Sequence, residues 1–349
     1  MAFSDICGNA HIKNILQKGL RRGRIPNSLL FTGPTGVGKM EAALVVAKAL
    51  NCLNMEDDSC DSCLNCRAVD KGNFPDVLKI VSEKEMAENS PEYFNEEEGG
   101  KKPKENITID QLRLMKQTAH LKPMVGRKRI FLIGQAERID LQSSNTLLKI
   151  LEEPPLYTHI ILLSDNPYSI LPTIRSRCQT LSFAAVSRKD IEEQLKRTGC
   201  DEQKARLISI LVRGNLKEAF EYDWEEMMAE RELSWAFFMA LLGGERRAEL
   251  LKDFTSKRKE IRDDLTRMFE LMLTLMRDVM LLQSEGRSSF LLNPDYMRPL
   301  EELARRMKRE RVIAFIRSLE KSLFAVKKKA NVNSLVSALF AEWMDKNYV

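Results

Sequence analysis

The first half of the chain alternates short apolar runs with stretches of helical spacing. Four runs are rich in Leu, Ile, Val and Phe and are short enough to be buried strands, whereas residues 40–50 are rich in Ala, Leu and Val, as in a helix. The expected strands are residues 28–32, 77–81, 129–133 and 159–164. Alternating strands and helices predict an α/β domain with a parallel sheet that helices cover on both faces.

The rest of the chain has a helical pattern. Residues 187–197 and 201–212 have the spacing of short amphipathic helices, and Gly199 and Gly214 mark their ends. From about residue 224 onward every pattern is helical, with long helices expected at 261–282 and 312–326. We therefore expect three domains: an α/β domain at 1–184, a small helical domain at 185–223 and an all-α domain at 224–349.

One part of the first domain has no apolar pattern. Between about residues 83 and 105 the chain is polar, with three successive Glu, two Gly and two Lys. Such a segment cannot bury enough apolar surface to offset the entropy of ordering it. We expect an exposed, mobile insertion here.

Composition supports a folded protein without a membrane segment. The 349 residues are 44% hydrophobic and 30% charged, as in globular domains. The most apolar stretch, 268–282, contains Glu270, Arg277 and Asp278, so it does not suit a bilayer. The first residues lack the basic and apolar regions of a signal peptide, so we expect a cytoplasmic protein with no membrane partner. The net charge of +5 does not indicate nucleic-acid binding by itself.

A phosphate-binding loop follows the first expected strand. Residues 33–39 match GxxxxGK and precede the expected helix. In such a loop the backbone N–H groups face phosphate oxygens, the helix dipole favours negative charge, and the lysine contacts the outer phosphates. The candidate nucleotide-binding residues are Gly33, Pro34, Thr35, Gly36, Val37, Gly38, Lys39 and Met40.

The groups that a hydrolysing loop needs are missing. The residue after the lysine should be Ser or Thr, whose hydroxyl coordinates Mg²⁺, but Met40 offers only a soft thioether. The strand 129–133 should lead into an Asp that holds the metal and a Glu that positions water, but Gly134 and Gln135 follow it. The sequence thus predicts that ATP can bind, with the loop's occupancy left open, and that efficient hydrolysis is excluded.

Four of the seven cysteines lie close together, with spacing C-x7-C-x2-C-x2-C. In a cytosolic chain this spacing is typical of a metal site rather than of disulfides. Four thiolates complete a tetrahedral Zn²⁺ shell and leave no position for substrate, so we expect a structural zinc knuckle at about 52–66. Reduced cysteines without metal and a redox dithiol remain alternatives. The expected ligands are Cys52, Cys60, Cys63 and Cys66.

Together these motifs resemble the bacterial clamp-loader ATPases of the AAA+ class, over about residues 1–220. Residues 145–155 have the sequence NTLLKILEEPP, which is similar to the family's helix and turn after the second nucleotide motif. Residues 176–178 form the family's Ser-Arg-Cys signature, and a four-cysteine insertion after the loop helix is a further family trait. The resemblance implies an AAA+ P-loop domain, a helical lid domain and an all-α collar domain that joins subunits into a ring.

Within the family, Met40, Gly134 and Gln135 resemble the delta prime branch of DNA polymerase III rather than the gamma/tau motor branch. This resemblance implies a non-hydrolysing subunit of the polymerase holoenzyme in DNA replication. Its partners would be the gamma/tau motor and delta subunits, and through them the sliding clamp and primer–template DNA. Position in the family motifs implies an arginine finger, acting on a neighbouring subunit, at Arg177, and sensor residues at Ser164 or Asp165 and at Lys217.

Two other functions remain as alternatives. An active gamma/tau-like ATPase would need an unusual magnesium site, with Glu137 as its acid, but Glu137 would point to the opposite side of the strand from position 134. We expect Glu137 to be a surface residue instead. A zinc-dependent DNA-binding module would need a basic stripe with interleaved aromatic residues, and the lysines at 327–329 are better explained as a solvated helix end.

Overall fold

The computed structural model describes residues 1–55, 57–89, 104–242, 261–284, 291–328 and 330–344. The chain forms two compact units, Met1–Glu221 and Tyr222–Val349. Residues 90–103 of the predicted polar insertion lie outside the described residues, and its beginning forms the helix α4, Glu83–Asn89. The boundary predicted at 184 and 185 lies within the first unit and stays a prediction.

A parallel sheet of five strands, in the order β2-β3-β4-β1-β5, is the centre of the first unit. Four strands lie where the apolar runs predict them, and β1, β3 and β4 are buried along their whole length because both faces of the sheet are covered. The strands are β1 Ser28–Thr32, β2 Val77–Ile80, β3 Arg129–Ile133, β4 Thr158–Ser164 and β5 Gln179–Ser182. The predicted α/β class with a parallel sheet is confirmed.

Sequence reasoning missed β5. Three of its four residues are exposed and polar, so it has no apolar run to reveal it. It exists because its backbone pairs with β1, with Thr32 opposite Ser182. An edge strand of this kind is defined by its neighbour, not by its own pattern.

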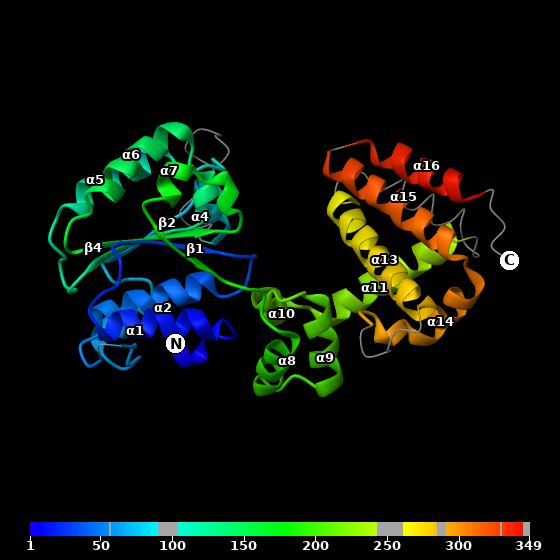
Figure 1. Cartoon of the computed structure of the whole chain (residues 1–349), viewed down its shortest axis with the longest axis horizontal. Coiled ribbons are helices and arrows are strands. Elements are labelled where there is room, and N and C mark those ends of the chain that lie inside the picture. Colours follow the sequence, from blue (N-terminus) through cyan, green and yellow to red (C-terminus); the bar gives the residue numbers. More distant parts are fainter. Residues whose placement is uncertain (56, 90–103, 243–260, 285–290, 329, 345–349) are drawn as a thin grey trace. The chain divides into compact units, whose positions relative to one another are not determined.

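Helices cover the two faces of this sheet (Figure 1). Figure 1 shows α1 and α2 on one face, and α5 and α6 on the other, where Leu112 and Leu147 pack against buried residues of β3 and β4. Three short helices, α8, α9 and α10, end the first unit. The bounds are α1 Ala10–Arg21, α2 Lys39–Asn51, α3 Leu64–Asp70, α5 Ile109–Ala119, α6 Leu141–Glu152, α7 Pro172–Arg175, α8 Arg188–Arg197, α9 Glu202–Leu211 and α10 Leu216–Glu221.

All regular secondary structure in the described part of the second unit is helical. Its core contains Phe315, whose ring packs edge-on against Trp343 at 4.6 Å between centroids and against Phe238 at 5.7 Å. The helices are α11 Trp224–Leu241, α13 Ile261–Gln283, α14 Met297–Arg306, α15 Arg309–Lys327 and α16 Val332–Met344. Lys328, just past α15, is exposed, whereas residue 329 lies outside the described residues. No described helix is long and apolar enough to cross a membrane.

Candidate functional site

The phosphate loop lies at the carboxyl ends of β1 and β4, where parallel sheets present ligand sites. Gly33 donates its N–H to the carbonyl of Ser164, the last residue of β4, at 3.3 Å. Gly33 has φ +143°, and a Cβ atom there would lie 2.3 Å from the carbonyl oxygen of Phe183. Only glycine fits this position, so the first residue of the motif is required by the turn itself.

The lysine of the loop is held by oxygen atoms of the chain. Lys39 is the first residue of α2, and its side chain is only 8% exposed. Its Nζ donates to the carbonyl oxygens of Gly33 at 2.7 Å and Pro34 at 2.5 Å, and it pairs with Asp165 Oδ1 at 2.6 Å. Of the two residues predicted at the first sensor position, Asp165 contacts the loop through its side chain, whereas the buried Ser164 contacts it through its backbone carbonyl.

The beginning of α10 and the residue before it pack on the loop from another direction. A Cβ atom on Gly36, which has φ +71°, would lie 1.6 Å from Asn215 Oδ1. The N–H groups of Leu216 and Lys217 donate to the Gly36 carbonyl at 2.9 and 3.2 Å. The predicted second sensor, Lys217, thus meets the loop through its backbone, while its exposed side chain pairs with Glu221 at 3.7 Å. Asn215 was not predicted, because an Asn beside a Gly has no distinctive sequence signal.

The position of the missing metal ligand is surrounded by side chains of the protein. A Cβ atom on Gly134 would lie 3.0 Å from Val81 Cγ1 and 3.9 Å from Met40 Cε. Met40 and Gly134, two of the three residues that replace the expected groups of a hydrolysing loop, are therefore neighbours in space. Glu85 also lies here, with Oε1 at 3.8 Å from the same point, and no motif predicted it because it comes from α4. Gln135 follows with a left-handed backbone, φ +47°.

Glu137, the alternative acid, is not on the strand. It lies in a short 3-10 turn, Ala136–Arg138, immediately after Gln135. Its side chain is half-buried instead of fully exposed, so the expectation of a surface residue is only partly met.

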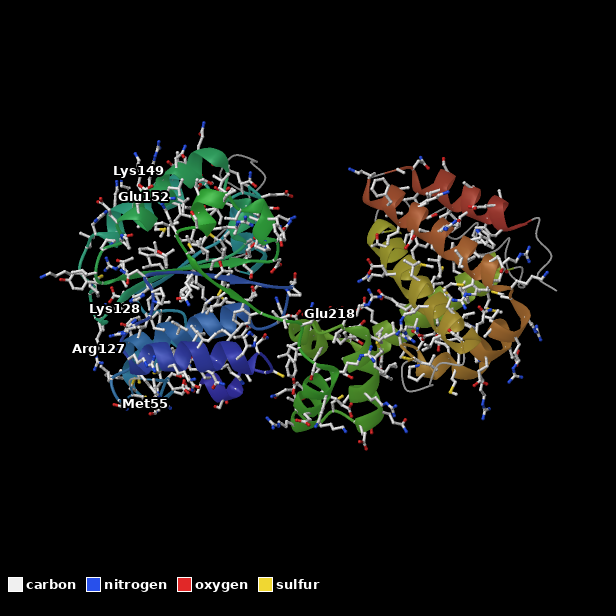
Figure 2. All side chains as sticks on the ribbon, in the orientation of Figure 1. Met55, Arg127, Lys128, Lys149, Glu152 and Glu218 are labelled. Atoms are coloured by element: carbon white, nitrogen blue, oxygen red, sulfur yellow. The ribbon has the colours of Figure 1, made fainter. Side chains whose placement is uncertain are left out.

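The predicted arginine finger lies just past α7. Arg177 is 36% exposed, donates to the Thr173 carbonyl at 3.0 Å and pairs with Glu152 at 2.8 Å. Figure 2 labels Glu152, the last residue of α6, at the surface of the first unit. The next residue, Cys178, is buried in the core, and burial raises the pKa of its thiol to about 11. Burial of Cys178 orients the motif, while the guanidinium of Arg177 stays accessible.

The four predicted metal ligands lie together. All four Sγ atoms are within 4.8 Å of one another. Cys52 directly follows α2, Cys63 is the N-cap of α3 and Cys66 lies in its first turn, so two helix ends and the loop between them bring the thiols together. Backbone N–H groups donate to sulfur within the two CxxC steps, Cys63 to Cys60 at 3.3 Å and Cys66 to Cys63 at 3.4 Å.

The electrostatics of the cluster suit a divalent cation. Hydrogen bonds from the Ser62 hydroxyl and from the backbone hold the pKa of Cys60 near 5, so this ligand is a thiolate at neutral pH. Burial instead raises the pKa of Cys66 well above its usual range. A buried thiol of this kind becomes a stable thiolate when a bound metal supplies positive charge. The donor set is therefore that of a closed structural site for a metal ion.

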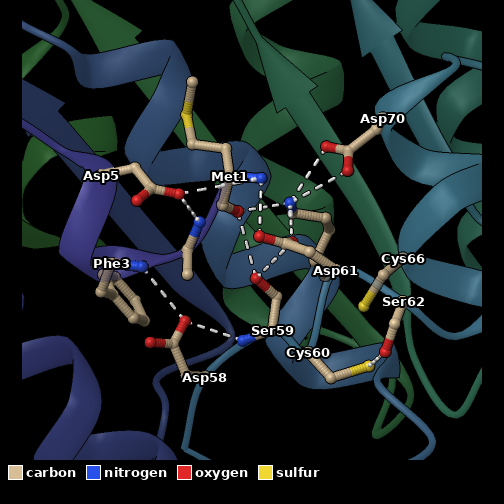
Figure 3. A network of polar contacts seen from close by, with 12 residues as sticks. Met1, Phe3, Asp5, Asp58, Ser59, Cys60, Asp61, Ser62, Cys66 and Asp70 are labelled. Carbon is tan, nitrogen blue, oxygen red and sulfur yellow. Dashed lines mark hydrogen bonds and ion pairs between the residues drawn. The ribbon is translucent and has the colours of Figure 1, made fainter. Parts of the chain in front are cut away.

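A charged network fastens this cluster to α2 and to the beginning of the chain (Figure 3). Lys48 of α2 is buried and pairs with Asp61 at 2.5 Å and Asp70 at 3.0 Å, and its Nζ also donates to the Met1 carbonyl. Burial alone would lower the pKa of Lys48, but the hydrogen bonds to the two carboxylates outweigh it and raise that pKa to about 12. Sequence reasoning missed Lys48, which looks like any lysine on an Ala-rich helix.

Two family models match the chain. The model described as "DNA polymerase III, delta subunit" matches residues 8–187, and the one described as "DNA polymerase III, delta subunit, C terminal" matches residues 242–343. The chain belongs to the DNA polymerase III delta subunit family. The clamp-loader relationship expected from its motifs is thereby confirmed.

The chain is also similar to individual proteins of known name. The chain is 29% identical over 219 residues to DNA polymerase III subunit delta' of Bacillus subtilis, covering 63% of this chain and 60% of that protein. It is 32% identical over 194 residues to subunit tau/gamma of Haemophilus influenzae, covering 55% and 25%. It thus spans less than two thirds of either relative. A crystal structure of a DNA polymerase III gamma subunit-related protein from Thermotoga maritima covers 95% of this chain and 97% of its own, at 19% identity and a TM-score of 0.44.

Proposed function

We propose that this chain is a non-hydrolysing subunit of the DNA polymerase III clamp loader, of the delta prime type. It would organise a hetero-oligomeric ring with gamma/tau motor and delta subunits that places the sliding clamp on primed DNA. Arg177 would act in a neighbour's nucleotide site, and Zn²⁺ would occupy the four-cysteine site. The family match and the similarity to subunits named delta' and tau/gamma support this proposal.

One observation carries the proposal: the phosphate-loop scaffold is intact, but its metal position is not. The strand, loop and helix are all present, whereas Val81 and Met40 lie beside the position where a carboxylate should hold Mg²⁺. A thioether and a methyl group cannot replace oxygen ligands of Mg²⁺. A chain with this loop would keep the fold that joins subunits into a ring but would not hydrolyse ATP.

The first test is steady-state ATPase activity of the purified chain. We expect a background rate, because neither a metal ligand nor a water-positioning group follows β3. The second candidate, an active ATPase, has one observation in its favour, namely the carboxylate of Glu85 near Gly134. A turnover that both Lys39→Ala and Glu85→Gln abolish would establish that candidate and refute ours.

The second test addresses Arg177 in the reconstituted complex with motor subunits, delta, clamp and primed DNA. An arginine finger is worth about 10³–10⁵ in rate at its own site, because it stabilises charge that develops in the transition state. We expect Arg177→Ala to leave ring assembly intact while clamp loading and DNA-stimulated ATPase fall in part, since other sites keep their own fingers. Arg113→Ala is the matched control, because Arg113 is also an exposed arginine paired with a carboxylate, Asp110 at 3.2 Å. Equal rates for both variants would show that Arg177 is structural.

A further inference from the structure

The lysine of the phosphate loop has a carboxylate of the chain, Asp165, as its ionic partner. A lysine ammonium has three N–H donors, and Lys39 has three oxygen partners: the Gly33 carbonyl, the Pro34 carbonyl and Asp165 Oδ1. A phosphate group would have to take at least one of these positions. The ionic partner, Asp165, is the one that a phosphate would replace, because both are anions.

Asp165 is held at both of its oxygen atoms. Oδ1 pairs with Lys39 at 2.6 Å, and Oδ2 accepts a hydrogen bond from the Thr35 hydroxyl at 2.7 Å. Both partners belong to the phosphate loop. Asp165 reaches them because it directly follows β4, whose last residue, Ser164, is paired with Thr32 at the end of β1. The parallel register of β1 and β4 therefore places the Asp165 carboxylate beside the loop.

The loop is also fastened from the side of α10. The Gly36 carbonyl accepts N–H groups of Leu216 and Lys217, and Asn215 occupies the space that a side chain at position 36 would need. Together, Asp165 and the beginning of α10 connect the loop to two separate parts of the first unit. These contacts hold the loop in the form described here.

We propose that Asp165 is an internal competitor for phosphate that determines whether the loop binds nucleotide. A polyphosphate must displace the carboxylate from Lys39 and then bear its negative charge nearby. Both effects weaken binding, since charge-assisted hydrogen bonds to a buried lysine are lost and like charges are brought together. The proposal goes beyond the role of Arg177 and does not depend on it.

The test is equilibrium binding of a ribose-labelled fluorescent ADP to the full chain, with and without Mg²⁺. Asp165→Asn keeps the shape of the side chain and removes its charge. We expect about tenfold tighter binding or more, the effect of one charge-assisted interaction. Asp110→Asn removes the same charge at an exposed residue of α5 that pairs with Arg113 instead of with the loop, and it should leave affinity unchanged.

Two further variants test whether the tighter ADP binding depends on the contact between Asp165 and the loop. Adding Lys39→Ala to Asp165→Asn should abolish the gain, because the phosphate contact goes with the lysine. Thr35→Val removes only the second anchor of the carboxylate, so it should give a smaller gain of the same sign even if Asp165→Asn folds poorly. Unchanged affinity in both Asp165→Asn and Thr35→Val, or a gain that survives Lys39→Ala, would overturn the proposal.

These outcomes are separable from those of the proposed function. If Asp165→Asn binds the probe but hydrolyses no ATP, both proposals stand. If Asp165→Asn hydrolyses ATP while the original chain does not, Met40 and Gly134 are not the cause of the missing activity, and the competitor role survives. If the variants bind no better than the original chain, the competitor role fails, and the ring-organising role is untouched.

Discussion

His159 shows how a single buried residue makes stability depend on pH. It lies within β4, is 4% exposed and contacts the Pro26 carbonyl through Nδ1 at 3.1 Å. Burial lowers its pKa from 6.5 to about 4, because the imidazolium cannot keep its hydration inside the sheet. The folded chain therefore holds this ring neutral over a pH range where an unfolded chain protonates it.

We expect the first unit to lose stability as the pH falls from about 6.5 to about 4. The pKa of the folded state lies below that of the unfolded state, so His159 contributes its full stability above pH 6.5 and loses it on acidification. The shift corresponds to about 3 kcal/mol. Urea unfolding followed by circular dichroism across this range should show a flatter slope in His159→Leu than in the control His120→Gln, an exposed residue. If the free energy of unfolding falls equally with pH in both variants, His159 is not the source of the pH dependence.

At the scale of elements, the cysteine cluster is a junction between two helices. It joins the end of α2 to the beginning of α3, and Lys48 binds the intervening loop to α2 through Asp61 and Asp70. The same helix α2 begins at Lys39 in the phosphate loop. The cysteine cluster and the phosphate loop thus lie at opposite ends of one helix.

We expect one zinc ion per chain in protein purified without chelator, and none in Cys63→Ser. Cys63 is also the N-cap of α3, where its sulfur accepts the N–H of Cys66. Serine is a favourable N-cap, so the variant removes a metal ligand while keeping the helix start. Elemental analysis checks the stoichiometry, and Cys200→Ser, outside the cluster, is the control that should keep its zinc. Zinc retained by Cys63→Ser would show that the four thiols are not the site.

On the scale of the whole molecule, the chain has two units with separate cores. The core of the second unit includes Phe315, and that of the first includes Phe131 of β3; both side chains are fully buried. All three tryptophans, at 224, 235 and 343, belong to the second unit. Tryptophan fluorescence therefore reports on the second unit.

We expect Phe315→Ala to destabilise the second unit by about 3–5 kcal/mol, through lost burial and the cavity that remains. The tryptophan unfolding midpoint in urea should fall accordingly. The matched variant Phe131→Ala should leave that midpoint in place and lower the transition seen only by circular dichroism. If Phe131→Ala moves the fluorescence midpoint equally, the two cores unfold as one.

Local pattern alone determined the elements whose own residues define them. The strands at 28–32 and 129–133 are apolar throughout, the phosphate loop needs glycines at positive φ, and the cysteine spacing matches a metal shell. These features depend on neighbours in the sequence, so they are visible without the fold. The sequence also shows directly that Gly134, and not the Asp of a hydrolysing loop, follows β3.

Tertiary structure alone decided which groups meet at the loop. Asp165, Asn215 and Glu85 come from three different segments, and only the parallel register of β1 with β4 and the packing of α4 and α10 bring them to Lys39, Gly36 and Gly134. β5 likewise exists through its pairing with β1. Contacts between distant segments depend on the direction in which each strand and helix leaves the core, and no local pattern of residues encodes that direction.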